Sequence, residues 1–372
     1  MNNLYSKIRY SALCFLLPLL LCAQENPNFN VSLQIDYSSA DQLIELCEGR
    51  LHNVGGVADA RGSQLAAATS ILLARKEFPA DIFRRELETL RDNFRSADDL
   101  FGFTPTRAHL AEIKGLLAEA KKQQLDRRVI ATISQFFPSD ARISAPLSVY
   151  IVAFGHENAS AFVRRVVWRG NTPMFVGEGE GEPVIVVNLQ RLIVGPSTQM
   201  QFIETLSTLA HEVFHAVFEV YQSNSLVWKE YNARRGPFWS LAELVQNEGI
   251  AYHISFQQRT GNALPPPIFE GAKQGLRTMN DAMRELLSPD LSASRAHELL
   301  MNANLSGSFE KNYGAAAGLL MAFAIDTKLG RPALNETIEK GVGDFFQKYD
   351  ALTKQYDELP KISEEVRREV LK

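Results

Sequence analysis

The chain has 372 residues, of which 45% are hydrophobic and 22% are charged, and its formal net charge at pH 7 is −4. A chain of this length and apolar content can bury one substantial core or two joined ones. Its mildly acidic balance excludes a polybasic surface of the kind that binds nucleic acid or anionic membranes. We therefore expect a globular protein that has no nucleic-acid partner.

The amino terminus has the pattern of a secretory signal peptide. A short segment with two basic residues precedes an apolar run from Ala12 to Cys22, which is too short for a transmembrane helix of the mature chain. Cleavage after Ala23 makes residues 1–23 the signal peptide and predicts an exported protein, either periplasmic or extracellular. In the alternative, a lipoprotein acylated on Cys22, Leu21 would occupy a position that needs a small residue. No later apolar stretch in the sequence is long enough to span a bilayer.

Residues 24–140 are expected to form a helical amino-terminal region. Five segments there show apolar residues at helical spacing, often with a polar cap and with proline or glycine at the ends. The predicted helices are Ser39–Arg50, Ala58–Glu77, Pro79–Phe94, Thr106–Ala120 and Asp126–Phe137. We interpret this region as a scaffold.

The pattern changes at Ala145, where β-rich segments begin. Three strands are predicted, Leu147–Phe154, Phe162–Trp168 and Val184–Leu189. The acidic run Gly177–Glu182 is expected to be a hairpin loop, and a substrate-binding role for its carboxylates is the alternative. Val184–Leu189 is either an edge strand that could pair with an extended peptide or an internal strand.

Residues 211–215 read His-Glu-Val-Phe-His. Side chains four apart lie on one face of a helix, so His211 and His215 can present two imidazoles to one metal ion. Glu212 lies one step round the helix, where its carboxylate can reach a water on that ion. A zinc hydrolase needs two nitrogen ligands, an adjacent general base and an open coordination position. The preceding residues predict a helix of about 25 residues, with Thr198 and Gln201 as a capping box.

A second predicted helix offers the third ligand of the ion. Ser240 and Glu243 fit another capping box, which places Glu248 in the middle of an apolar helix. A carboxylate is costly there unless it is paired or bound to a metal ion. Gly249 beside it favours a close approach of a second helix. His253 is the rival ligand, although it points to a different face from Glu248.

The two motifs resemble those of the gluzincin metallopeptidases. In the aminopeptidase branch of that group, a His-Glu-x-x-His helix precedes a second helix carrying Asn-Glu-Gly-aromatic-Ala, and here Asn247–Ala251 reads Asn-Glu-Gly-Ile-Ala. The resemblance implies one zinc ion held by His211, His215 and Glu248, with Glu212 as the general base. The chain lacks the Gly-x-Met-Glu-Asn segment that grips a free amino terminus. It is more similar to the poorly characterised bacterial families of zinc-dependent peptidases.

Gluzincins also supply a tyrosine that stabilises the negative charge on the carbonyl oxygen during hydrolysis. Tyr313, in Asn-Tyr-Gly-Ala, resembles that residue and is our predicted catalytic tyrosine. A tyrosine packed in the core is one alternative, and Tyr252, one turn beyond Glu248, is another candidate for the catalytic role. Tyr313 belongs to the helical carboxy-terminal region 261–372, which is expected to complete the active-site cleft.

The sequence therefore predicts an α+β protein that is mainly α, with a zincin-like catalytic core at residues 141–260. In this core a small sheet precedes the metal-binding helix, and helical regions flank both. The predicted function is an exported zinc metallopeptidase that cleaves a peptide or protein substrate. A secreted zinc-containing binding or scaffold protein without turnover is the alternative, although such a protein would have no need of Glu212.

Overall fold

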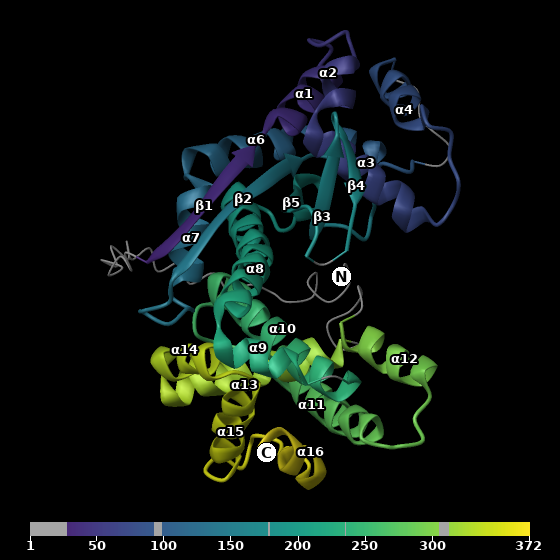
Figure 1. Ribbon diagram of the computed structural model, residues 1–372. Helices are drawn as coiled ribbons and strands as arrows, with labels where there is room; N and C mark the ends of the chain where they lie inside the picture. Colours follow the sequence, from purple (N-terminus) through teal and green to yellow (C-terminus); the bar gives the residue numbers. More distant parts are fainter. Residues whose placement is uncertain (1–27, 93–98, 178, 235, 305–311) are drawn as a thin grey trace. The chain divides into compact units, whose positions relative to one another are not determined.

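The computed structural model describes residues 28–92, 99–177, 179–234, 236–304 and 312–372 (Figure 1). The predicted signal peptide therefore lies outside the described residues, as does Glu178 of the acidic run. The described chain is mainly helical, with one small mixed sheet, which confirms the predicted fold class at this level.

The chain forms two compact units. One comprises the described residues up to Asn30 together with Ala131–Ser144 and Val217–Lys372, and the other comprises Val31–Ile130 and Ala145–Ala216. The division passes through one continuous helix, α8, after Ala216. These units do not test the predicted domain boundaries, which stay predictions.

The sheet has five strands in the order β1-β2-β5-β3-β4. The strands are β1 (Phe29–Asp36), β2 (Ile143–Val152), β3 (Ala161–Arg169), β4 (Thr172–Phe175) and β5 (Glu182–Asn188). β2 pairs with β5 in parallel, whereas β3 is antiparallel to both β5 and β4. The three predicted strands are present, and β1 and β4 are strands that the sequence reading missed.

β5 is an internal strand, so its predicted alternative as an edge strand is wrong. It lies between β2 and β3, with Tyr150 opposite Val186 and Val163 opposite Ile185. Its four apolar residues are fully buried, as expected for a central strand that is covered on both faces. On its side away from β5, β3 pairs with β4 only over Val166–Arg169. Among the described residues, the first part of β3 is therefore an open strand edge.

The acidic run is not a hairpin loop. β4 and β5 are not neighbours in the sheet, since β3 lies between them. The run therefore connects two strands that are separated in the sheet by β3. One of its carboxylates has a structural role. Glu182 accepts a hydrogen bond from the Trp168 ring nitrogen of β3 at 2.5 Å. The hairpin of this sheet is instead β3–β4, which turns at Gly170 in the left-handed region with φ 62°.

A group of helices lies between β1 and β2 in the chain, and α3 of this group packs on the sheet. This part contains α1 (Ser38–Cys47), α2 (Gly55–Asp59), α3 (Arg61–Ala74), α4 (Ile82–Arg91), α5 (Phe103–Ala108), α6 (Leu110–Lys122) and α7 (Leu125–Ser134). A Cβ on Gly62 of α3 would lie 3.1 Å from Cβ of Tyr150, so α3 packs directly on β2. The structure divides two of the predicted helices, because breaks at Ala60 and His109 separate α2 from α3 and α5 from α6.

The remaining elements begin with the short 3-10 helix η2 (Leu189–Leu192) and the long helix α8 (Thr198–Asn224). They continue with α9 (Leu226–Asn232), α10 (Pro237–Thr260), α11 (Pro266–Leu286), α12 (Ala293–Ala303), α13 (Tyr313–Leu329), α14 (Arg331–Lys340), α15 (Val342–Thr353) and α16 (Glu364–Val370). None of the helices in the described part of the chain is long and apolar enough to cross a membrane.

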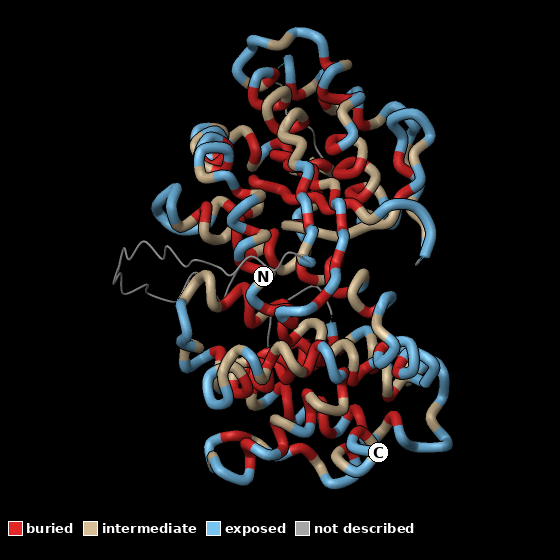
Figure 2. The backbone as a smooth tube through the Cα atoms, turned by 60° about the vertical axis from the view of Figure 1, so that its left-hand side comes forward, coloured by how far each residue is buried: buried red, intermediate tan, exposed pale blue. Residues whose placement is uncertain are grey.

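α13 is the central helix of its unit, and its residues are buried over most of its length. Figure 2 colours buried segments of the chain red. α13 crosses α10 at two glycines. A Cβ added to Gly318 would lie 1.9 Å from the carbonyl oxygen of Val245, and one added to Gly249 would lie 2.3 Å from the carbonyl carbon of Gly318. No side chain fits in either place, so the predicted close approach of a second helix at Gly249 is confirmed.

Replacement of Gly318 by alanine should push α10 and α13 apart. We expect Gly318→Ala to lower the free energy of unfolding by about 2–3 kcal/mol, because the neighbouring atoms are backbone and cannot rotate away. Gly343→Ala in α15 is the matched control, since its Cβ would meet the nearest atom at an ordinary 3.5 Å. Urea unfolding of the metal-free protein measures both. Equal stability of the two variants would contradict the close crossing.

Candidate metal centre

α8 places both histidines of the motif on one face. The helix begins one residue earlier than predicted, because Ser197 rather than Thr198 caps it and accepts a hydrogen bond from the Met200 amide at 3.3 Å. Apolar side chains bury the opposite face, whereas His211 and His215 are only half-buried. Their Nε2 atoms are 3.0 Å apart, and their rings meet edge to face with centroids separated by 4.6 Å.

α10 carries the candidate third ligand, Glu248, near its middle. The helix begins with Pro237 at its first turn, so the predicted capping box of Ser240 and Glu243 is wrong. Ser240 instead donates from its hydroxyl to the Gly236 carbonyl oxygen, and Glu243 accepts from Gln222 Nε2 at 2.8 Å. Proline is well suited to the first turn of a helix, since no amide hydrogen is needed there.

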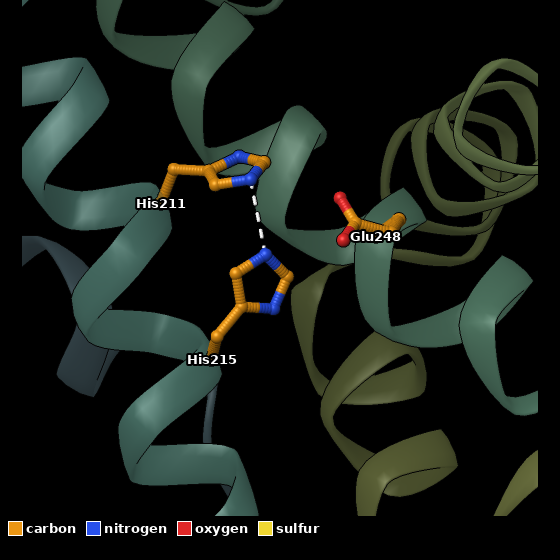
Figure 3. A group of neighbouring side chains, drawn as sticks. All are labelled: His211, His215 and Glu248. Carbon is orange, nitrogen blue, oxygen red and sulfur yellow. Dashed lines mark hydrogen bonds between the residues drawn. The ribbon is translucent and has the colours of Figure 1, made fainter. Parts of the chain in front are cut away.

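The three predicted ligands lie together. One donor atom each from His211, His215 and Glu248 can be chosen so that all lie within 4.8 Å of one another, and all three residues are half-buried. Figure 3 shows the two imidazoles extending from one helix towards the Glu248 carboxylate on another. Among the described residues, this group includes neither His253 nor Glu243.

The donor set suits zinc. Two imidazole nitrogens and one carboxylate oxygen are ligands that zinc takes in catalytic sites, with the fourth position left for water or substrate. Ligand atoms about 2.1 Å from a tetrahedral zinc ion are roughly 3.4 Å apart, close to the 3.0 Å between the two Nε2 atoms. The carboxylate completes the set with a negative charge. These three residues could therefore hold a zinc ion with only small adjustments.

Glu212 is half-buried on α8, next to His211. Its carboxylate interacts electrostatically with the guanidinium of Arg164, a residue of β3. Partial burial lowers the pKa of Arg164, and the negative charge of Glu212 opposes that shift. Arg164 donates from Nη1 to the Val163 carbonyl oxygen and lies over the Phe162 ring. The sheet therefore brings one positive charge towards the predicted general base.

His253, the rival ligand, belongs to a buried cluster. Its side chain is almost fully buried, and Nε2 lies 2.7 Å from Asp326 Oδ2 of α13. Arg331 of α14 donates to both oxygens of Asp326, at 2.8 and 2.7 Å, and its guanidinium carbon lies 3.6 Å from the centroid of the Phe136 ring. The cluster links three helices of the unit.

The protonation states in this cluster follow from its contacts. Burial acts to raise the pKa of Asp326, but the hydrogen bonds from His253 and Arg331 outweigh it, and the pKa lies well below its ordinary value. Burial also lowers the pKa of His253, against the effect of Asp326. An ionised carboxylate only accepts hydrogen bonds, so Nε2 of a neutral His253 carries the proton. His253 therefore has a structural partner outside the group of candidate ligands.

Tyr313 lies in the core at the first residue of α13. Its hydroxyl donates to the Leu299 carbonyl oxygen of α12 at 2.7 Å, and burial raises its pKa. The only hydroxyl proton of Tyr313 is used in this bond, as expected for the core tyrosine that the sequence left as an alternative. Tyr252 is half-buried on α10, four residues after Glu248. The role of Tyr313 in catalysis stays a prediction.

A family model matches residues 57–358, and the family is described as "Putative zinc dependent peptidase (DUF5700)". The match covers most of the chain, including all the candidate site residues. The chain belongs to this family. No curated protein and no solved structure matches the chain. Membership of a zinc-dependent peptidase family agrees with the donor set of His211, His215 and Glu248.

Two polar residues, which interact with Glu248 or Glu212, were not predicted from the sequence. Asn304, the residue that follows α12, donates from Nδ2 to Glu248 Oε1 at 2.6 Å. Arg164 acts on Glu212 from β3. Neither belongs to a motif, and both are far in sequence from the residues that they influence. The sequence contains no specific signal for either residue, since a lone asparagine after a helix or a lone arginine in a strand can face either solvent or a site.

Removal of the carboxylate ligand should abolish tight zinc binding. We expect the parent protein to bind one zinc ion and Glu248→Ala to bind it more than about 100-fold more weakly, because the loss of outer hydrogen-bond partners alone costs about 10- to 100-fold. Glu243→Ala, on the same helix, is the matched control and should keep the parent affinity. Metal analysis and chelator competition provide the measurement. Loss of zinc in His253→Ala, with retention in Glu248→Ala, would show that His253 is the third ligand.

Proposed function

We propose that this protein is an exported zinc metallopeptidase that hydrolyses peptide bonds with Glu212 as general base. The observation that carries the proposal is the group of His211, His215 and Glu248, with Glu212 adjacent to a ligand on the same helix. Family membership supports zinc-dependent peptidase chemistry in general terms. We add to this description a specific role for each of the four residues.

The proposed roles follow from the residue types. A zinc ion, when bound, acts as a Lewis acid that activates water for attack on a carbonyl carbon. Glu212 accepts a proton from the attacking water as the new carbon–oxygen bond forms. It then gives that proton to the amide nitrogen as the carbon–nitrogen bond breaks, so that a carboxylate and an amine are released. His211 and His215 supply nitrogen donors in their neutral form.

We also propose a zincin-like arrangement in which an extended peptide binds along β3. Residues 161–164 of β3 pair with β5 on one side, and the described part of β4 begins its pairing only at Val166. An open strand edge can bind an extended peptide through its backbone groups. Arg164 lies in this segment and is influenced by Glu212. The edge would therefore bring a peptide towards the general base.

The residue that stabilises the developing oxyanion is proposed to be Tyr252 in preference to Tyr313. Tyr252 lies one helical turn from Glu248 on the same helix, so the two side chains share a face of α10. The Tyr313 hydroxyl is engaged with Leu299 and lies in the core.

The central test of the mechanism is Glu212→Gln. Glutamine keeps the size of glutamate but cannot accept a proton, so hydrolysis should slow by roughly two to four orders of magnitude. The zinc content should stay at the parent value, because Glu212 is not one of the three donors. A peptide-library digest by the zinc-loaded parent first identifies a substrate, and kcat/KM is then compared. Glu219→Gln, at an exposed position on the same helix, is the control and should leave the rate unchanged.

Two results would contradict this mechanism. Cleavage of the same peptide by Glu212→Gln at the parent rate would exclude Glu212 as the general base. Failure of the zinc-loaded parent to cleave any peptide in the library would favour a zinc-containing binding or scaffold protein.

The export proposal rests on the sequence of residues 1–23. Mass spectrometry of the protein recovered from its native host should show a chain that begins near Gln24. A diacylglyceryl group on Cys22 would show a lipoprotein instead, and an uncleaved chain would contradict export by this route.

A further inference from the structure

Glu248 has a hydrogen-bond partner that the mechanism above does not use. Asn304 Nδ2 donates to Glu248 Oε1 at 2.6 Å, although the two residues are 56 positions apart in the chain. Asn304 follows α12, whereas Glu248 lies on α10. An amide nitrogen is suited to this contact, because it donates a hydrogen bond without adding a charge.

α12 is held in place by its neighbours. Arg295 near its start donates from Nε and Nη2 to the two carboxylate oxygens of Glu285 on α11, at 2.8 and 3.1 Å. The Tyr313 hydroxyl of α13 donates to the Leu299 carbonyl oxygen in the middle of α12. Contacts with two other helices therefore fix α12, and with it the position of Asn304.

We infer that Asn304 is a positioning residue for the metal centre, one that orients the Glu248 carboxylate towards the two histidines. Its hydrogen bond restrains the carboxylate through Oε1. This inference rests on the proposed zinc site. The role of α12 in the site is then to hold Asn304, which restrains the ligand Glu248.

The expected effect is a change in zinc affinity. Outer hydrogen bonds to metal ligands are worth about 10- to 100-fold in affinity. Asn304 is exposed and water can replace its amide in part, so the lower end of this range applies. We expect Asn304→Ala to bind zinc about tenfold more weakly than the parent. Asn304→Asp should bind still more weakly, because it puts a second negative charge beside Glu248 where the donor was.

Chelator competition on the full chain measures the zinc affinity of each variant. Asn302→Ala is the matched control, since Asn302 is the same residue type and lies on α12 two positions before Asn304. It should keep the parent affinity. Thermal unfolding of the metal-free proteins should give the same Tm for Asn304→Ala and the parent. A fall in Tm that accounts for the loss of affinity would mean that Asn304 serves α12 alone, and would overturn the inference.

A double-mutant cycle separates positioning from a general structural effect. In the Glu248→Ala background, the added change Asn304→Ala should have no further effect on zinc affinity, because the restrained carboxylate is already absent. The same tenfold loss in both backgrounds would refute the inference. Parent-like affinity of Asn304→Ala in a parent that binds zinc would also refute it. A parent that binds no zinc would instead refute the proposed function.

Discussion

The close crossing of α10 and α13 is the constraint on which the metal centre depends. The two backbones approach at Gly249 and Gly318, where there is no space for a Cβ. Glu248 precedes Gly249, so the contact that fixes the helix also fixes the residue that carries the carboxylate. A ligand on a rigid element is held in position better than one on a loop. The glycine contributes nothing to the chemistry, yet it determines where the carboxylate lies on the unit.

Further contacts secure the same helix. His253, Asp326 and Arg331 join α10 to α13 and α14 through buried hydrogen bonds. A buried charged group is stable only when its hydrogen bonds are made, so this cluster specifies how the three helices meet. The sequence presents His253 as a second candidate ligand near Glu248, whereas its contacts show it as part of the framework. Histidine thus has two roles in this protein, as a candidate metal ligand at positions 211 and 215 and as part of the buried framework at position 253.

Local patterns in the sequence were sufficient for some parts of the molecule. The spacing of His211 and His215 predicted a shared helix face, and the apolar surroundings of Glu248 predicted a paired or metal-bound carboxylate. Gly249 correctly indicated a close helix contact. Each of these signals lies within a turn or two of the residue concerned, although the segments that meet Glu248 and Gly249 in the structure are distant in the sequence.

Features that depend on distant segments could not be predicted in the same way. The apolar run in β5 is compatible with either an edge or an internal strand, and only its pairing with β2 and β3 decides between them. Asn304 gains its significance from α12 packing beside α11 and α13. The capping predictions failed because Ser197 and Pro237 offered alternative helix starts close by. Competing local signals of similar strength leave the choice to the tertiary structure.

The account is tested most directly by anomalous diffraction at the zinc absorption edge from crystals of the zinc-loaded protein. One strong peak is predicted, within about 2.0–2.2 Å of one nitrogen each of His211 and His215 and of one carboxylate oxygen of Glu248. Glu212 should lie outside ligand distance from that peak. A peak at another group of residues, or a zinc ion ligated directly by Glu212 and not by Glu248, would contradict the site and the mechanism built on it.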